Sequence, residues 1–186
     1  MTRKCVTDEQ YGQLSRRLGE LLRRVDEGTI PFARALADAQ LLVEGKTFQP
    51  HIIDCDATPY LPEGWKGTVY HKKGGMFEWN LAKVYLHLSP NQQDGKTIKG
   101  HNLRKELENE PVLNANVLDY LLAHPELIPE EWKGKAVFFW GTIYRDSDDD
   151  LCVRYLCWGG SQWYWDYGWL GLDWSSPDPA ACSQAA

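Results

Sequence analysis

Aromatic side chains concentrate towards the carboxyl end of this chain, where seven of its nine tryptophans lie between Trp132 and Trp174. In the segment 162–169 they alternate with other residues, and successive side chains of a β-strand point to opposite faces. Such a strand would gather four rings on one face: Trp163, Trp165, Tyr167 and Trp169. Stacked indole rings hold sugars, bases or cationic groups through their apolar faces and negative quadrupole. The pattern predicts an aromatic sheet face that is either a core wall or a ligand platform.

Both interpretations of this aromatic face have a physical basis. Burying large rings stabilises a fold by about 2–3 kcal/mol each, so a core role alone accounts for them. The opposite face, with Gln162, Tyr164 and Asp166, would then be exposed. In the other interpretation the rings hold a ligand, and the neighbouring Asp166 and Asp173 accept hydrogen bonds from hydroxyls or pair with a cation. The two also combine, if some rings are buried while Trp158 or Trp174 lines a groove. The candidate ligand contacts are Trp158, Trp163, Trp165, Asp166, Trp169, Asp173 and Trp174.

A second candidate site lies at Asp54 and Asp56, whose carboxylates fall on one side of an extended segment. Paired carboxylates serve as general acid and base, or hold Mg²⁺. A third ligand or a base would come from one of His71, His87 and His101. This pattern supports an alternative hypothesis, a small metal-dependent hydrolase. No residue pattern requires a cofactor, and none defines a metal site.

Four carboxylates in the five residues Asp146–Asp150 are reminiscent of a calcium loop. An EF-hand loop also needs Gly at its sixth position and Glu at its twelfth, where this chain has Leu151 and Cys157. We therefore interpret the segment as a hairpin turn whose Asp side chains bond to their own backbone.

Basic residues form two pairs, seven positions apart, on one face of an expected first helix. They are Arg16, Arg17, Arg23 and Arg24. Such a face is either a solvated surface or a docking face for an acidic partner or nucleic acid. The second possibility gives a third hypothesis, a nucleic-acid-associated factor. Residues 144–186 carry two basic and seven acidic residues, which would repel a polyanion from the aromatic end.

Composition limits the class of protein. The 186 residues suit one domain, or one domain with an appendage, and the net charge is −6. No apolar run approaches the roughly 20 residues that span a bilayer, and the first ten residues lack the apolar core of a signal peptide. Five cysteines without a CxxC pair disfavour a disulfide framework or a zinc finger. We expect a cytoplasmic protein with no membrane partner.

The elements that must position these residues begin with a helical hairpin over 8–45. One face of its first helix carries Leu14, Leu18, Leu21, Leu22 and Val25, and Gly28 ends that helix. Thr29 and Pro31 start the second helix. Its apolar stripe consists of Phe32, Leu36, Ala39 and Val43.

Beyond the hairpin we expect an α+β fold with a mixed middle region. Strands are predicted near 68–71 and 83–88, a short extended segment at 76–79, and helices at 103–107 and 112–124. From residue 136 the apolar period changes to two, which predicts a three-strand antiparallel meander over 136–145, 151–158 and 162–170. The expected parts are a hairpin at 1–46, an α+β domain at 47–175 and a loosely ordered tail at 176–186.

Three strings in the chain carry a resemblance: PEEWKGK at 129–135, VFFWGTIYRD at 137–146, and RYLCW at 154–158 leading to WYW at 163–165. With these strings the chain resembles a group of small uncharacterised bacterial proteins. The resemblance implies a bacterial cytoplasmic origin and brings no activity with it. Our leading hypothesis is a non-catalytic binding or protein-interaction module for an unknown protein or small molecule, acting through the aromatic sheet face or groove.

Overall fold

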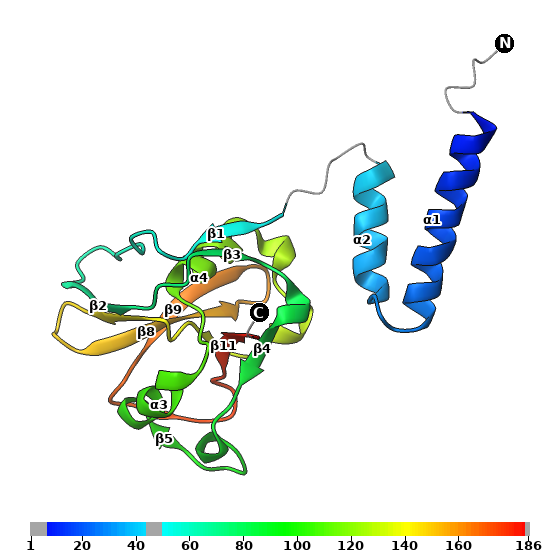
Figure 1. Ribbon diagram of the computed structural model, residues 1–186. Helices are drawn as coiled ribbons and strands as arrows, with labels where there is room; N and C mark the ends of the chain where they lie inside the picture. Colours follow the sequence, from blue (N-terminus) through cyan, green and yellow to red (C-terminus); the bar gives the residue numbers. More distant parts are fainter. Residues whose placement is uncertain (1–6, 44–49, 185–186) are drawn as a thin grey trace. The chain divides into compact units, whose positions relative to one another are not determined.

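The computed structural model describes residues 7–43 and 50–184, and the chain divides into two compact units, 1–50 and 51–186 (Figure 1). Helices lie towards the amino end and strands towards the carboxyl end, so the α+β class is confirmed. The expected boundary between 46 and 47 lies outside the described residues.

The first unit is the predicted helical hairpin. Helix α1 (Asp8–Asp26) begins at a capping box, in which Thr7 and Gln10 each accept a hydrogen bond from the other's backbone N–H. Gly28 follows α1 with a φ of 71°, a conformation that glycine adopts without steric cost. Helix α2 (Phe32–Val43) follows it.

The second unit is built on a seven-stranded mixed sheet (Figure 1). Its order is β2-β7-β8-β6-β11-β4, and β9 pairs with β8. The strands are β2 (Gly67–His71), β4 (Val84–His87), β6 (Val137–Phe138), β7 (Thr142–Arg145), β8 (Leu151–Trp158), β9 (Trp163–Trp169) and β11 (Ala180–Ser183).

Shorter elements surround this sheet. Two small antiparallel ladders pair β1 (Ile52–Asp54) with β3 (Met76–Glu78) and β5 (Ile98–Lys99) with β10 (Asp173–Trp174). The α-helices are α3 (Gly100–Glu106) and α4 (Ala115–Ala123). The 3-10 turns are η1 (Leu81–Lys83), η2 (Pro90–Gln92), η3 (Leu107–Asn109), η4 (Pro125–Leu127) and η5 (Glu130–Trp132).

The predicted meander is present, but its first strand is divided. Both β6 and β7 pair antiparallel with β8, and residues 139–141 interrupt them. The cause lies at Gly141, whose N–H donates to the Leu113 carbonyl at 2.9 Å. A Cβ there would lie 2.8 Å from that oxygen, so the chain leaves the ladder to pass close to another segment.

The expectation of a loosely ordered tail at 176–186 is wrong for β11. This strand lies between β6, to which it is parallel, and β4, to which it is antiparallel. Ala181 and Cys182 are fully buried. Backbone N–H groups of Ala136 and Phe138 donate to the carbonyls of Pro177 and Pro179, which fixes the approach to the strand. The carbonyls of Pro177 and Pro179 therefore join the segment before β11 to the sheet.

Apolar side chains cover both faces of the sheet. On one face Val137, Leu156 and Ala181 pack with the buried side of α4. On the other face Phe138, Val153 and Cys182 pack with residues of α3, β5 and β10. The sheet is therefore the middle layer of the second unit, with one apolar cluster on each of its faces.

Candidate functional site

Strand β9 shows the alternation that its sequence predicts. Trp163, Trp165 and Tyr167 are half-buried, and Tyr164 and Asp166 between them are exposed. Trp163 and Trp165 pack against the core formed with α4. These two rings therefore contribute to the core.

Other side chains lie against the Trp165 ring. The Arg154 guanidinium is 4.3 Å from its centre, and the rings of Tyr60 and Trp65 approach edge-on at 6.5 Å and 6.3 Å. Trp65 also lies edge-on to Tyr167 at 5.1 Å. The segment before β2 thus brings aromatic rings onto this face, a long-range contact that no spacing in the sequence reveals.

The remaining tryptophans of the candidate set have different surroundings. The Lys133 ammonium lies 4.0 Å from the Trp158 ring centre. Trp169 is the most exposed indole of β9, and its N–H donates to the Asp146 carboxylate at 2.7 Å. Trp158, at the end of β8, is therefore half-buried, and Trp169, at the end of β9, is the more exposed of the two.

Trp174 does not line a groove, and that expectation is wrong. The residue is 3 % exposed, and its ring lies 4.1 Å from that of Phe138. It occupies space left by two glycines, because a Cβ at Gly100 or Gly168 would lie within 3 Å of its ring. Its neighbour Asp173 is exposed and pairs with Lys99 at 3.0 Å.

The carboxylates of Asp54 and Asp56 hold the backbone. One oxygen of Asp54 accepts from the N–H groups of Asp56 and Ala57, at 2.9 Å and 3.1 Å. One oxygen of Asp56 accepts from Gly75 and Gly74, and these bonds lower the pKa of the Asp56 carboxyl. The two side chains therefore hold the backbone at one end of the β1–β3 ladder, where β1 ends and β3 begins.

His71 bonds to the residue between these two aspartates, and both of its ring nitrogens take part in hydrogen bonds. Nε2 donates to the Cys55 carbonyl at 3.1 Å, and Nδ1 accepts from the Thr142 hydroxyl at 2.9 Å. Burial lowers the pKa of His71, which favours the neutral form of the ring. Within residues 7–43 and 50–184, no group of three His, Cys, Asp or Glu side chains is placed to hold a metal ion.

The acidic hairpin turn has the structure that we inferred. One Asp146 oxygen accepts from the backbone N–H groups of Asp148 and Asp150, at 3.0 Å and 2.9 Å. The side chain is 3 % exposed, and its other oxygen accepts from Trp169. The turn thus shapes the β7–β8 hairpin through side-chain bonds to its own backbone.

The arginine face of α1 is partly neutralised by carboxylates of the same helix. Arg23 donates to Glu20 and Glu27, and Arg24 lies 3.6 Å from Glu20. Arg16 and Arg17 are exposed. The positive charge available to an acidic partner is therefore smaller than four arginines indicate.

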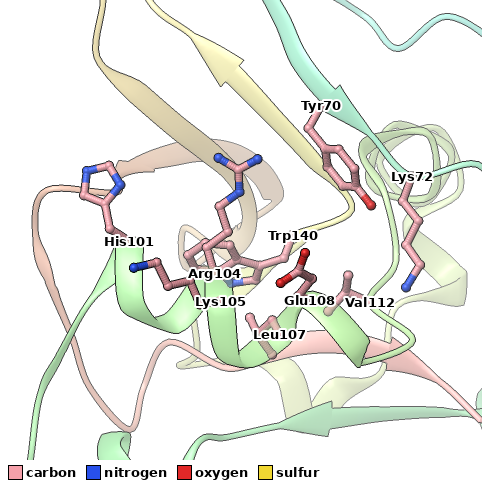
Figure 2. A pocket seen from close by; sticks show the side chains of 9 residues that line it. All are labelled: Tyr70, Lys72, His101, Arg104, Lys105, Leu107, Glu108, Val112 and Trp140. Carbon is pink, nitrogen blue, oxygen red and sulfur yellow. The ribbon is translucent and has the colours of Figure 1, made fainter.

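A cavity of about 610 Å³ lies between the end of β2 and helix α3, at residues that the sequence did not single out as a group (Figure 2). His101, Arg104 and Lys105 come from α3, while Tyr70 and Lys72 face them from the other side. The full lining comprises Tyr70, Lys72, His101, Arg104, Lys105, Leu107, Glu108, Val112 and Trp140.

Positive charge dominates this cavity. Lys72, Arg104 and Lys105 oppose a single carboxylate, that of Glu108. The Arg104 guanidinium lies 5.8 Å from the Tyr70 ring centre. The spacing of residues 101, 104 and 105 gives a sequence signal, because positions three and four apart share a helix face. The facing residues Tyr70, in β2, and Lys72, just after it, are brought to this helix only by the tertiary fold.

No family model matches this chain, and neither a curated protein nor a solved structure does. Across the described helices, none combines the length and the apolar character needed to cross a membrane.

Proposed function

We propose that the unit 51–186 is a non-catalytic binding domain whose ligand, a small organic anion, occupies the cavity between β2 and α3. The main support for this proposal is that Lys72, Arg104 and Lys105 line one concave site in a chain of net charge −6. Like charges held together repel each other, and an anion bound among them removes that cost.

The side chains suit a carboxylate or phosphate group. Arg104 presents a planar fork that donates two parallel hydrogen bonds, and Lys105 adds a mobile point charge. Lys72 is already oriented, because its ammonium donates to the Glu110 carbonyl at 2.6 Å. Tyr70 offers a ring beside the guanidinium for a planar ligand part. The cavity volume of about 610 Å³ is within the range of small-molecule sites, roughly 300–1,000 Å³.

The aromatic face of β9 supports the same class of function less directly. Exposed Tyr164 and partly open Trp169 offer contact area, whereas Trp163 and Trp165 already pack against other side chains. Ligand contact at this face stays a prediction. The hydrolase and nucleic-acid hypotheses have weaker support, because Asp54 and Asp56 hold turns and Arg23 and Arg24 pair with carboxylates.

Binding is tested with two probes, inorganic pyrophosphate and benzoate, titrated into the ¹⁵N-labelled full-length chain. We expect saturable amide shifts centred on residues 100–108, because that helix carries Arg104 and Lys105. Lys105→Glu should weaken pyrophosphate binding by about tenfold or more, the effect of losing one charge-assisted contact.

The matched control is Lys96→Glu, which makes the same charge change at an exposed lysine outside the cavity lining. Its affinity should stay within about twofold of the unchanged chain. Equal loss in both variants, or shifts that never saturate, would show that the probes respond to overall charge and would overturn the proposal.

A further inference from the structure

The helical hairpin of residues 7–43 buries almost none of its apolar side chains within its own unit. No residue of α1 is buried, and Ala35 is the one buried residue of α2. Eight large apolar residues are between 47 % and 82 % exposed: Tyr11, Leu14, Leu18, Leu22, Phe32, Leu36, Leu42 and Val43. Tertiary packing of an apolar face supplies most of the stability of short helices in proteins. This surface therefore needs a partner.

The apolar positions repeat with the period of a coiled coil. On α1 they are spaced by three and four residues in turn: Tyr11, Leu14, Leu18, Leu21 and Val25. On α2 the spacing is four, three and four: Phe32, Leu36, Ala39 and Val43. A seam with an average spacing of 3.5 residues packs against another helix with the same repeat. The hairpin carries two such seams joined by a short turn.

The exposed apolar area is what a stable dimer requires. A large apolar side chain about two-thirds exposed offers roughly 100 Å², so the eight together offer roughly 800 Å². Each partner in an interface of standard size contributes about 800 Å². Monomeric proteins rarely leave an apolar patch of this extent uncovered.

Charges beside the seams permit self-association. Residues 7–43 hold six acidic and five basic side chains, so two copies meet with little net repulsion. Arg23 pairs with Glu20 and with the C-cap residue Glu27, and Arg34 pairs with Asp38. These internal pairs leave a surface with no strong excess of either sign, as two identical faces require.

We propose that the occupant of this surface is a second copy of the chain. The hairpins of two copies pack about a two-fold axis into a four-helix bundle, with Leu14, Leu18 and Phe32 in its core. A pair of 3.5-residue seams is matched in spacing by another such pair, and a two-fold interface uses the same patch on both copies. Each assembly then carries two copies of the unit 51–186.

The experiment measures the mass of the full chain in solution, by light scattering and sedimentation over the micromolar range. We expect twice the 21.3 kDa chain mass. Leu18→Asp with Leu22→Asp should raise the dimer dissociation constant about 100-fold or more, since each buries a charge in the bundle. All nine tryptophans lie in 51–186, so unchanged fluorescence shows that this unit stays folded.

Two further variants separate contact from helix formation. Leu18→Ala keeps high helix propensity, so a roughly tenfold weaker dimer would reflect lost packing alone. Gln13→Asp places the same charge on the opposite side of α1 and should leave the dimer intact. A monomeric unchanged chain overturns the proposal, as does a dimer that survives Leu18→Asp with Leu22→Asp.

Discussion

Arg154 and Asp119 form a two-bond ion pair that ties the central strand β8 to helix α4. The guanidinium donates to the two carboxylate oxygens at 2.7 Å and 3.2 Å. Arg154 is 1 % exposed, and the Trp165 ring lies against it at 4.3 Å. A charged group so fully removed from water is tolerated because its partner and an aromatic face accompany it.

Asp119→Ala should lower the free energy of unfolding by about 3 kcal/mol, because it leaves the Arg154 charge buried without its carboxylate. Urea unfolding followed by tryptophan fluorescence measures the change. Asp173→Ala is the control, since it removes an exposed ion pair with Lys99 and should cost less than about 1 kcal/mol. Similar losses in both variants would contradict a special role for the buried pair.

Gly141→Ala should destabilise the second unit by about 1–3 kcal/mol. Its Cβ would lie 2.8 Å from the Leu113 carbonyl oxygen and 2.9 Å from the Asn114 Cα, and both neighbours belong to the packed approach to α4. Thermal unfolding provides the measurement. Gly171→Ala adds a Cβ with nothing within 4 Å, so it should change stability by less than about 0.5 kcal/mol.

Asp146→Asn should weaken the acid sensitivity of the fold. Burial opposes ionisation of Asp146, but hydrogen bonds from the Trp169 indole and two backbone N–H groups outweigh it and lower the pKa. A lowered pKa adds stability above the ordinary carboxyl value of 3.8 and loses it as the pH falls through the folded-state pKa.

In the unchanged chain, stability should therefore fall below about pH 4, and the Asn variant should show a flatter profile there. Asp148→Asn is the control, because the indole N–H of Trp169 donates to the carboxylate of Asp146 and not to that of Asp148. Identical acid profiles for the unchanged chain and Asp146→Asn would contradict this assignment.

The buried thiols should resist alkylation in the folded protein. Burial raises the pKa of Cys55 to about 11 and those of Cys152 and Cys182 to about 12, and only the thiolate reacts. Iodoacetamide at about pH 8 should label them far more slowly than in urea. Cys5 lies outside the described residues, so the experiment uses Cys5→Ser; partly exposed Cys157 should react first.

The same buried thiols should make the free energy of unfolding fall at alkaline pH. Their folded-state pKa values exceed the ordinary value of 9.0, so the stabilisation is complete below about pH 9 and is lost as pH rises towards 12. Cys182→Ala and Cys152→Ala should each reduce the loss of stability over that interval. A stability that is constant across it in the unchanged chain would contradict the buried, protonated state.

The local elements of this chain could be predicted because their signals are local. Periodicity and Gly28 indicate the hairpin, although the Thr29 hydroxyl bonds to the Arg24 carbonyl instead of capping α2, and alternation indicates β8 and β9. The break between β6 and β7 could not be predicted from the sequence, since it depends on contact between Gly141 and Leu113. Strand β11 was missed because short stretches of small residues acquire strand structure only from their neighbours.

The candidate sites likewise combine features that local sequence predicts with features that depend on long-range contacts. The alternating faces of β9 were foreseen, but the burial of Trp174 depends on Gly100 and Gly168, which lie on other segments. The cavity joins residues from α3 with Tyr70 and Lys72, about thirty positions earlier. Sequence spacing identifies residues that share one helix or strand, but it does not identify residues that two separate elements bring together.

The position of β11 constrains how the protein is made. Its register aligns Ala180 with Phe138 and Cys182 with Tyr85, so the seam between β4 and β6 stays open until residue 183 has left the ribosome. Until then a nascent chain presents two unsatisfied strand edges, each able to recruit a stray segment. The central part of the sheet can therefore close only after nearly all of this unit has been synthesised.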